Sequence, residues 1–233
     1  MEIPILYEDN HLLVVEKPVN VPVQEDASGD PDVLSLLKKD LKIRYQKPGN
    51  VYLGLVHRLD RPVGGVMVFA KTSKSASRLA DSLRKNEIER KYIAVVRGTP
   101  RKKAALLEHY LSKNNRKNVV QTVSQDHKSG KKAVLEYQTV AQRDKLSLLS
   151  VKLHTGRSHQ IRVQLSASGF PLYGDQKYGS QVNRPGQQIA LWAYSLKFVH
   201  PVKKEVMRLE SFPPHTYPWT VWGSIQDMLQ MEK

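Results

Sequence analysis

One short stretch of the sequence sets an acid among basic side chains, next to a turn. In VHRLDRPVGG, residues 56–65, Asp60 stands between Arg58 and Arg61, with His57 close by and a Pro-x-Gly-Gly turn after it. Nearby cations favour the ionised form of a carboxyl group, so this pattern is compatible with a carboxylate that takes part in chemistry. The alternative is an aspartate that caps a turn and pairs with its neighbours. The local sequence leaves both interpretations open.

A second stretch, LHTGRSHQIRVQL, predicts a helix that begins with several polar donors. Thr155 or Ser158 can act as its N-cap, which turns exposed backbone N–H groups and the positive end of the helix dipole toward a ligand. Arg157 and His159 add donors at that end, and Arg162 follows Ser158 by four residues, on the same face. The stretch fits a clamp for phosphate and carboxylate groups, and it also fits a well-capped helix with solvated arginines.

A third stretch, IERKYIAV, contains a tyrosine among basic residues. Alternation along a strand places Arg90 and Tyr92 on one face and Lys91 on the other. A strand tyrosine usually packs in the core. Beside cations, its ring can also stack on an extruded nucleobase.

The elements that position these stretches form an α+β pattern. Helices are predicted at 32–45 with Asp32 as N-cap, at 73–87 with Ser73 as N-cap, at 158–169 with Gly169 as its stop, and at 218–230 opened by Pro218. Strands are predicted at 3–18 (two strands around a turn at Asp9–Asn10), 51–56, 65–72, 88–98, 118–124, 133–140, 146–154, 188–201 and 204–211. Several consecutive strands are separated only by turns, so antiparallel pairing should dominate. We expect one domain over residues 1–233.

Several classes of chemistry lack their motifs. The chain has no cysteine, which excludes disulfides, thiolate metal sites and cysteine nucleophiles. Neither a phosphate-binding P-loop nor a dinucleotide-binding glycine pattern occurs, and His154 and His159 are too loosely spaced for a helical metal pair. No metal and no cofactor are therefore expected. The acidic start and the short apolar runs predict neither a secretory signal nor a membrane span, so a cytoplasmic protein is expected.

The charge distribution points to a polyanionic partner. The 233 residues carry a net charge of +15, yet residues 1–32 hold eight acids and one base. Residues 84–132 hold 14 Lys or Arg against 4 Asp or Glu. A block this unbalanced favours nucleic acid, because each neutralised phosphate releases counterions. The alternative is a merely solvated basic face.

Taken together, these stretches resemble the RluA family of RNA pseudouridine synthases. The resemblance extends from YEDNHLLVVEKPVNVPV through HRLD, the R-K-Y strand and GRSHQIR to FPLYGDQKYG. It implies the pseudouridine synthase fold, a mixed and mainly antiparallel sheet flanked by helices and loops, with a central basic cleft. Two departures are visible: Val63-Gly64 stands where Thr-Ser is common, and Gln164 where a histidine is frequent. No S4-type domain is expected ahead of the catalytic part.

The resemblance also implies roles for individual residues. Asp60 would be the catalytic aspartate, Tyr92 the active-site tyrosine and Arg162 the cation that pairs with Asp60. Arg61 is a candidate for filling the gap left by a flipped uridine. RNA contacts are expected at Arg58, Arg61, Arg90, Lys91, Arg157, His159 and Gln160.

The implied reaction converts uridine to pseudouridine in rRNA or tRNA. It breaks the N1–C1′ bond, turns the uracil and rejoins it through C5, which requires no metal, nucleotide or redox cofactor. Asp60 could attack C1′ or remove a C2′ proton, and the sequence leaves both routes open. Two alternatives are a non-catalytic RNA-binding or ribosome-assembly factor and a nucleobase-releasing glycosidase. We expect a monomer.

Overall fold

The computed structural model describes residues 2–230 and divides the chain into two compact units. The first unit comprises residues 1–90 and 193–211, and the second comprises residues 91–192 and 212–233. Two strands, β5 and β10, change unit along their length.

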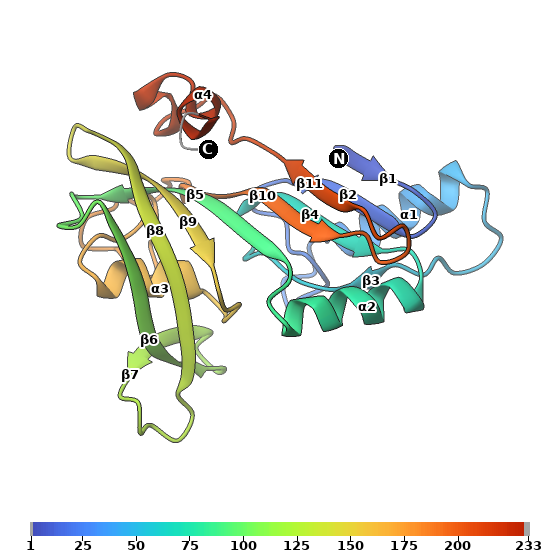
Figure 1. Cartoon of the computed structure of the whole chain (residues 1–233), viewed down its shortest axis with the longest axis horizontal. Helices are drawn as coiled ribbons and strands as arrows, with labels where there is room; N and C mark the ends of the chain where they lie inside the picture. The colour runs from blue at the N-terminus through green and yellow to red at the C-terminus, as the bar shows by residue number, and fades with distance from the viewer. Residues whose placement is uncertain (1, 231–233) are drawn as a thin grey trace. The chain divides into compact units, whose positions relative to one another are not determined.

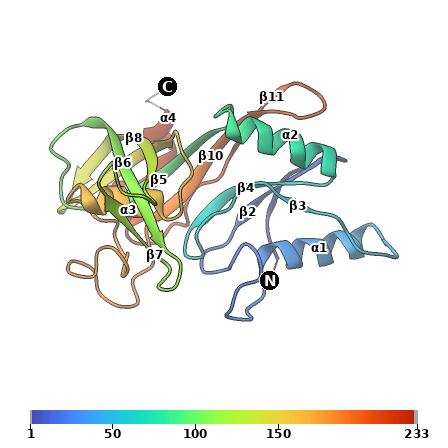
Figure 2. The same cartoon turned by 90° about the horizontal axis from the view of Figure 1, so that it is seen from below.

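The first unit is a sheet with two helices (Figure 1). Its elements are β1 (Ile5–Glu8), β2 (Leu12–Lys17), α1 (Val33–Arg44), β3 (Gly54–Leu55), β4 (Gly64–Ala70), α2 (Ser73–Arg84), most of β10 (Leu191–Val199) and β11 (Val206–Glu210). The strand order is β1-β2-β4-β10, with β3 paired to β4 and β11 paired to β10. The apolar runs of β2 and β4 are fully buried, and α2 packs along β3 and β4 (Figure 2). The strand β4, which follows the Asp60 turn, is therefore part of the core of this unit.

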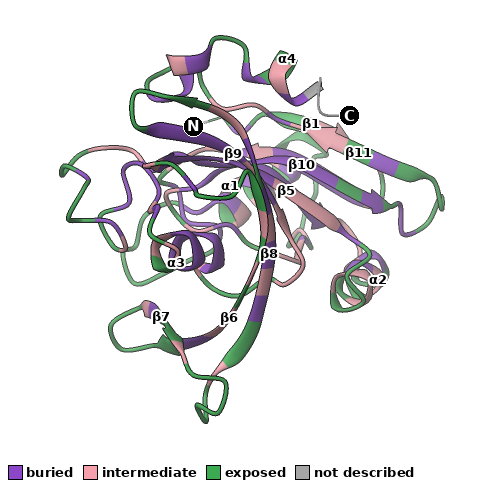
Figure 3. Cartoon of the chain, turned by 60° about the vertical axis from the view of Figure 1, so that its left-hand side comes forward, coloured by how far each residue is buried: buried purple, intermediate pink, exposed green. Residues whose placement is uncertain are grey.

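The second unit contains most of β5 (Glu89–Arg97) and the long strands of the chain. Its other elements are β6 (Ala104–Asn114), β7 (Val119–Val123), β8 (Lys131–Arg143), β9 (Leu146–Leu153), α3 (Gln160–Ala167), a 3-10 helix (Trp219–Trp222) and α4 (Ile225–Gln230). The strand order is β5-β9-β8-β6-β7. Leu111, Val120 and Ala133 pack with Val163 of α3, whereas the turns joining β6, β7 and β8 are exposed (Figure 3). This packing fixes α3, which carries Arg162, against the sheet.

The α+β prediction is confirmed, and so is the antiparallel prediction for every pair of strands with a known register. The turn at Asp9, the Asp32 cap of α1 and the stop at Gly169 (φ +90°) are also confirmed. The prediction of a strand at 51–56 is correct only for Gly54–Leu55, which form β3.

Three predictions of helix ends are wrong. Thr72, one residue before Ser73, caps α2, because its Oγ1 accepts the Ser75 N–H at 3.2 Å. Neither Thr155 nor Ser158 caps α3, whose N-cap residue is His159 in a left-handed conformation. The expected final helix is a 3-10 turn followed by the short α4, since Gly223 adopts a positive φ of 76° between them.

The strand β6 was missed altogether. Its sequence, AALLEHYLSKN, consists mainly of residues that favour helices and contains no β-branched residue. It is nevertheless paired on both sides, with β7 and with β8. Pairing and packing within the sheet therefore outweigh the intrinsic preference of this stretch.

Candidate active site

Asp60 lies in a tight turn that leads directly into a buried strand of the first unit. Val63 donates its N–H to the Asp60 carbonyl oxygen at 2.9 Å, and β4 begins one residue later. Gly65 has a φ of +119°, and a Cβ there would lie 2.2 Å from the Ala193 carbonyl oxygen. Only glycine fits at this position. The turn that carries Asp60 is thus held tightly against the sheet.

His57 acts as a structural anchor for the same turn. Its Nε2 accepts the Val68 N–H of β4 at 3.1 Å. Burial, together with the positive charge of Arg90, lowers the pKa of His57 to about 4. The ring is therefore neutral at pH 7 and serves to hold the segment, not to donate a catalytic proton.

Lys17, at the end of β2, was missed by the sequence reasoning. Its side chain has 0% exposure, and its Nζ donates to the carbonyl oxygens of Pro18 at 2.7 Å and Arg61 at 3.0 Å. Burial lowers the pKa of Lys17 to about 7, while the charge of Asp60 opposes this shift and that of Arg61 adds to it. A lysine closing an apolar strand, and the only base among residues 1–32, was the signal available in the sequence.

Arg61 is engaged by an acidic loop. Its guanidinium donates to the Asp30 carboxylate, to Ser28 Oγ at 3.1 Å and to the Asn20 carbonyl oxygen at 3.1 Å. Asp26 lies 4.0 Å from the same group. Arg58 is exposed on the surface and contributes to lowering the pKa of Asp26, after the hydrogen bonds from Ser28. Both arginines beside Asp60 are exposed, but the guanidinium of Arg61 is already bonded to the acidic loop.

Arg162 is buried in the second unit and forms a two-bond ion pair. Its Nε donates to Asp175 Oδ2 at 2.8 Å and its Nη2 donates to Asp175 Oδ1 at 2.9 Å. The Tyr178 ring lies beneath the guanidinium, 5.1 Å from Arg162 Cζ. Asp175 was also missed as a functional candidate, although its segment was part of the resemblance.

The residues around the start of α3 differ in accessibility. Gln160 is buried, and its amide bonds Thr155, the Arg157 N–H and the Val134 carbonyl oxygen. Arg157 is exposed and donates from Nε to the Lys132 carbonyl oxygen at 3.0 Å, and His159 Nδ1 lies 2.6 Å from the Tyr178 hydroxyl. Gln160 therefore links the start of α3 to β8 through hydrogen bonds, while Arg157 is exposed to solvent.

Tyr92 and its neighbours on β5 complete the predicted set. Tyr92 is 7% exposed, and Lys91 and Arg90 are partly buried. Arg90 Nε is buried and has no hydrogen-bond partner among residues 2–230. Asp60 belongs to the first unit, whereas Tyr92 and Arg162 belong to the second. That Asp60, Tyr92 and Arg162 act together in one active site remains a prediction.

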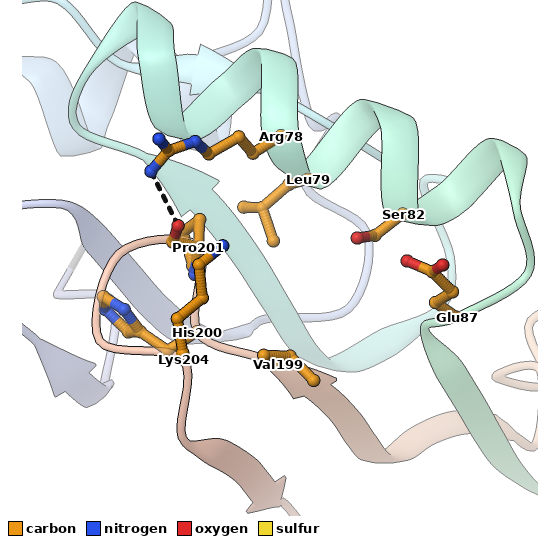
Figure 4. Close-up of a pocket in the computed structure, with 8 residues that line it drawn as sticks. All are labelled: Arg78, Leu79, Ser82, Glu87, Val199, His200, Pro201 and Lys204. Carbon is orange, nitrogen blue, oxygen red and sulfur yellow. Dashed lines mark hydrogen bonds between the residues drawn. The ribbon is translucent and has the colours of Figure 1, made fainter.

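One further hollow lies in the first unit, between α2 and the turn after β10 (Figure 4). Arg78 points across it and donates to the Pro201 carbonyl oxygen at 2.8 Å, while Ser82, Glu87 and Lys204 line its polar side. None of the predicted site residues lines this hollow. Within residues 2–230 there is no group of three or more His, Asp or Glu side chains suited to a metal ion, and no helix long and apolar enough to cross a membrane.

The family model of RNA pseudouridylate synthase matches residues 11–167, a segment that contains Asp60, Tyr92 and Arg162. The chain belongs to this family. A Bacillus subtilis relative, "Uncharacterized RNA pseudouridine synthase YhcT", is 33% identical over 216 residues, covering 91% of this chain and 69% of the relative. "Ribosomal large subunit pseudouridine synthase D" of Haemophilus influenzae is 34% identical over 221 residues, covering 87% of this chain and 65% of the relative.

Solved structures share the fold of this pseudouridine synthase. "Human RNA Pseudouridylate Synthase Domain Containing 4" matches with a TM-score of 0.76 at 23% identity, covering 91% of this chain and 88% of that chain. "Human RNA Pseudouridylate Synthase Domain Containing 1" matches with a TM-score of 0.74 at 21% identity, covering 99% and 94%. These structures confirm the fold, while the family model and the curated relatives confirm the resemblance to RluA-type enzymes and the assignment as an RNA-directed isomerase.

The two departures from the usual family pattern have structural explanations in this synthase. Val63 is buried in the core, where an apolar side chain packs better than a hydroxyl group. Gln164 is also fully buried, and its Nε2 contacts the carbonyl oxygens of Leu107 at 3.1 Å and Ala133 at 3.2 Å. Both residues therefore support the elements that carry the candidate site.

Proposed function

We propose that this pseudouridine synthase modifies uridines in ribosomal RNA, with Asp60 as the group that acts on the ribose. The relative from Haemophilus influenzae, named as a large-subunit synthase, supports the choice of rRNA over tRNA. The observation that carries the assignment of Asp60 is its place in a rigid turn, secured by the Gly65 backbone and by Lys17. A carboxylate fixed in this way can meet a bound ribose with little loss of entropy.

In the proposed reaction, Asp60 in its ionised form begins cleavage of the N1–C1′ bond. It either attacks C1′ or removes a proton from C2′, and both routes need an anion at the same place. The uracil then turns, and its C5 bonds to C1′ as Asp60 is released from C1′ or the C2′ proton is returned. C5 finally loses its proton, and N1, which kept the electron pair of the broken bond, gains one. Because uridine becomes its own isomer, the reaction consumes no co-substrate, and none is proposed.

Arg162 and Tyr92 would complete the site. Arg162 would pair with Asp60 and orient its carboxylate. Tyr92 would stack on the flipped uracil, and its hydroxyl group would assist removal of the C5 proton. We further propose that the two units together form one catalytic domain that acts as a monomer in the cytoplasm.

RNA binding would use the accessible cations near these groups. Arg58, Arg157 and Lys91 would contact phosphates, and so would the partly exposed side chain of Arg90. His159 would add a donor or acceptor at the start of α3. Arg61 and Gln160 were expected to contact RNA as well; their bonds to the acidic loop and to Val134 support a scaffolding task.

Incubation with ribosomal RNA carrying tritium at uridine C5 tests this function. The proposal predicts tritium release while the modified base stays attached to the chain. A non-catalytic RNA-binding factor would release no tritium, and a glycosidase would free the base and leave an abasic site. Parallel reactions with tRNA separate the two substrate classes, and faster release from tRNA would overturn the choice of rRNA.

A further inference from the structure

The segment FPLYGDQKYG, residues 170–179, forms part of the family resemblance but has no task in the function proposed above. In the second unit it contains Asp175, an acid with 0% exposure. Burial of a charged carboxylate is costly unless a cation and further donors accompany it. The partners of Asp175 therefore show what the segment is built to hold.

The first partner is Arg162, bound through two hydrogen bonds. Nε and Nη2 meet the two carboxylate oxygens at 2.8 and 2.9 Å, and the Arg162 side chain is 7% exposed. Such a pair fixes the plane of the guanidinium as well as its position. Arg162 Cζ also lies over the Tyr178 ring, 5.1 Å from the ring centroid. The two hydrogen bonds therefore restrict the orientation of the guanidinium group.

The acid is itself held rigidly. Asp175 Oδ1 accepts the N–H groups of Lys177 at 2.9 Å and Tyr178 at 3.2 Å. The preceding Gly174 has a φ of +78°, and a Cβ there would lie 2.2 Å from the Gln188 carbonyl oxygen. Asn183 Oδ1 accepts the Gly174 N–H at 2.9 Å. The carboxylate that grips Arg162 therefore cannot shift easily.

Stability alone does not account for such an arrangement. A buried ion pair can often be replaced by apolar residues of similar volume without loss of stability. A guanidinium that must face a reacting group needs its direction set, because a misplacement of about 1 Å can lower a rate about 100-fold. We infer that Asp175 is a positioning residue that aims Arg162 at the reacting centre. This inference rests on the role proposed for Arg162.

The primary test is the single-turnover rate of Asp175→Asn at saturating RNA. An asparagine can still accept the Lys177 and Tyr178 N–H groups, but its NH2 group would face the Arg162 Nε–H, donor against donor. We expect a rate at least ~10-fold lower and an RNA dissociation constant changed less than ~3-fold. The matched control is Asp144→Asn, an acid of the same unit that is 78% exposed and lies 3.7 Å from Arg143. It should keep the wild-type rate.

A double-mutant cycle separates positioning from a general loss of structure. If Asp175 acts only through Arg162, then Asp175→Asn combined with Arg162→Met should be no slower than Arg162→Met alone. Losses that multiply, or a wild-type rate in Asp175→Asn, would overturn the inference while leaving the proposed function intact. A wild-type rate in Arg162→Met would instead overturn the proposed role of Arg162, and the inference with it.

Folding is controlled by a second variant. Asp175→Glu keeps the charge but displaces it by one methylene group, so we expect a rate between those of Asp175→Asn and the wild type. All rates are measured well below the melting temperature of each variant. If Asp175→Asn does not fold, the single-turnover rate of Asp175→Glu tests the inference instead. A reduced rate in Asp175→Glu supports a positioning role for Asp175, and a wild-type rate contradicts it.

Discussion

The turn that carries Asp60 and the helix that carries Arg162 fix their charged residues in opposite ways. Around Asp60 the bonds go to the main chain: Lys17 binds the Arg61 carbonyl oxygen, and Val63 binds that of Asp60. Arg162 is fixed through its own charged group, which Asp175 grips. The first arrangement sets where a carboxylate is placed, and the second sets where a guanidinium points. Changes near Asp60 should therefore act through the main chain that Lys17 holds, whereas changes near Arg162 should act on the ion pair that contains the functional group itself.

The largest effect on stability is expected on the Arg162 side. Arg162→Met leaves Asp175 buried without its cation, which should lower the free energy of unfolding by about 3–5 kcal/mol. The matched exposed pair is Arg143 with Asp144, where Arg143→Met should cost less than about 1 kcal/mol. Urea denaturation of both variants measures the difference. Equal losses of unfolding free energy in the two variants would mean that the buried ion pair contributes no more to stability than the exposed one.

On the Asp60 side, the expected effect depends on pH. The pKa of Lys17 is about 7 in the folded chain, below the ordinary value of 10.5. Between these values the unfolded chain binds more protons, so the free energy of unfolding should rise with pH, by about 2 kcal/mol from pH 7 to pH 9. Below pH 7 both states hold the proton, and this contribution becomes constant.

Lys17→Met should abolish that rise, since methionine does not titrate. Denaturation of the wild type and the variant at pH 7, 8 and 9 tests this. Lys39→Met, on the exposed side of α1, is the control and should keep the wild-type slope. A constant difference between wild type and Lys17→Met at all three pH values would contradict a lowered pKa for Lys17.

A smaller effect is expected away from both groups, in the basic loop between β5 and β6. Arg101, Lys102 and Lys103 are exposed there. Changing all three to glutamate should reduce the slope of log affinity against log salt by up to ~3, because each lost phosphate contact removes ~0.9. The control changes three lysines of α1, at positions 38, 39 and 42, in the same way. An unchanged slope in the loop variant would remove this loop from the RNA-binding surface.

Much of the fold and part of the candidate site were predictable from the sequence. The features that were missed have physical causes. The β2 and β4 runs, the Asp32 cap and the motif around Asp60 are local patterns, and local patterns can be recognised in a sequence. The strand β6 was missed because its neighbours, β7 and β8, impose its conformation.

The supporting residues were missed for a related reason. Lys17 is 44 residues from its acceptor Arg61, and Asp175 is 13 residues from Arg162. No periodic pattern links such pairs, so only the folded chain brings them together. The same limit applies to Arg61, whose acidic partners lie in a loop some thirty residues earlier in the chain.

Single-turnover release of tritium from uridine C5 by Asp60→Asn tests catalysis through Asp60 directly. This change keeps the size of the side chain and removes the anion, so no group remains to act on the ribose. We expect release below detection, with an RNA dissociation constant within about tenfold of the wild type, or roughly 1.4 kcal/mol. Release near the wild-type rate would contradict catalysis through Asp60 and leave the aspartate as a capping residue of its turn.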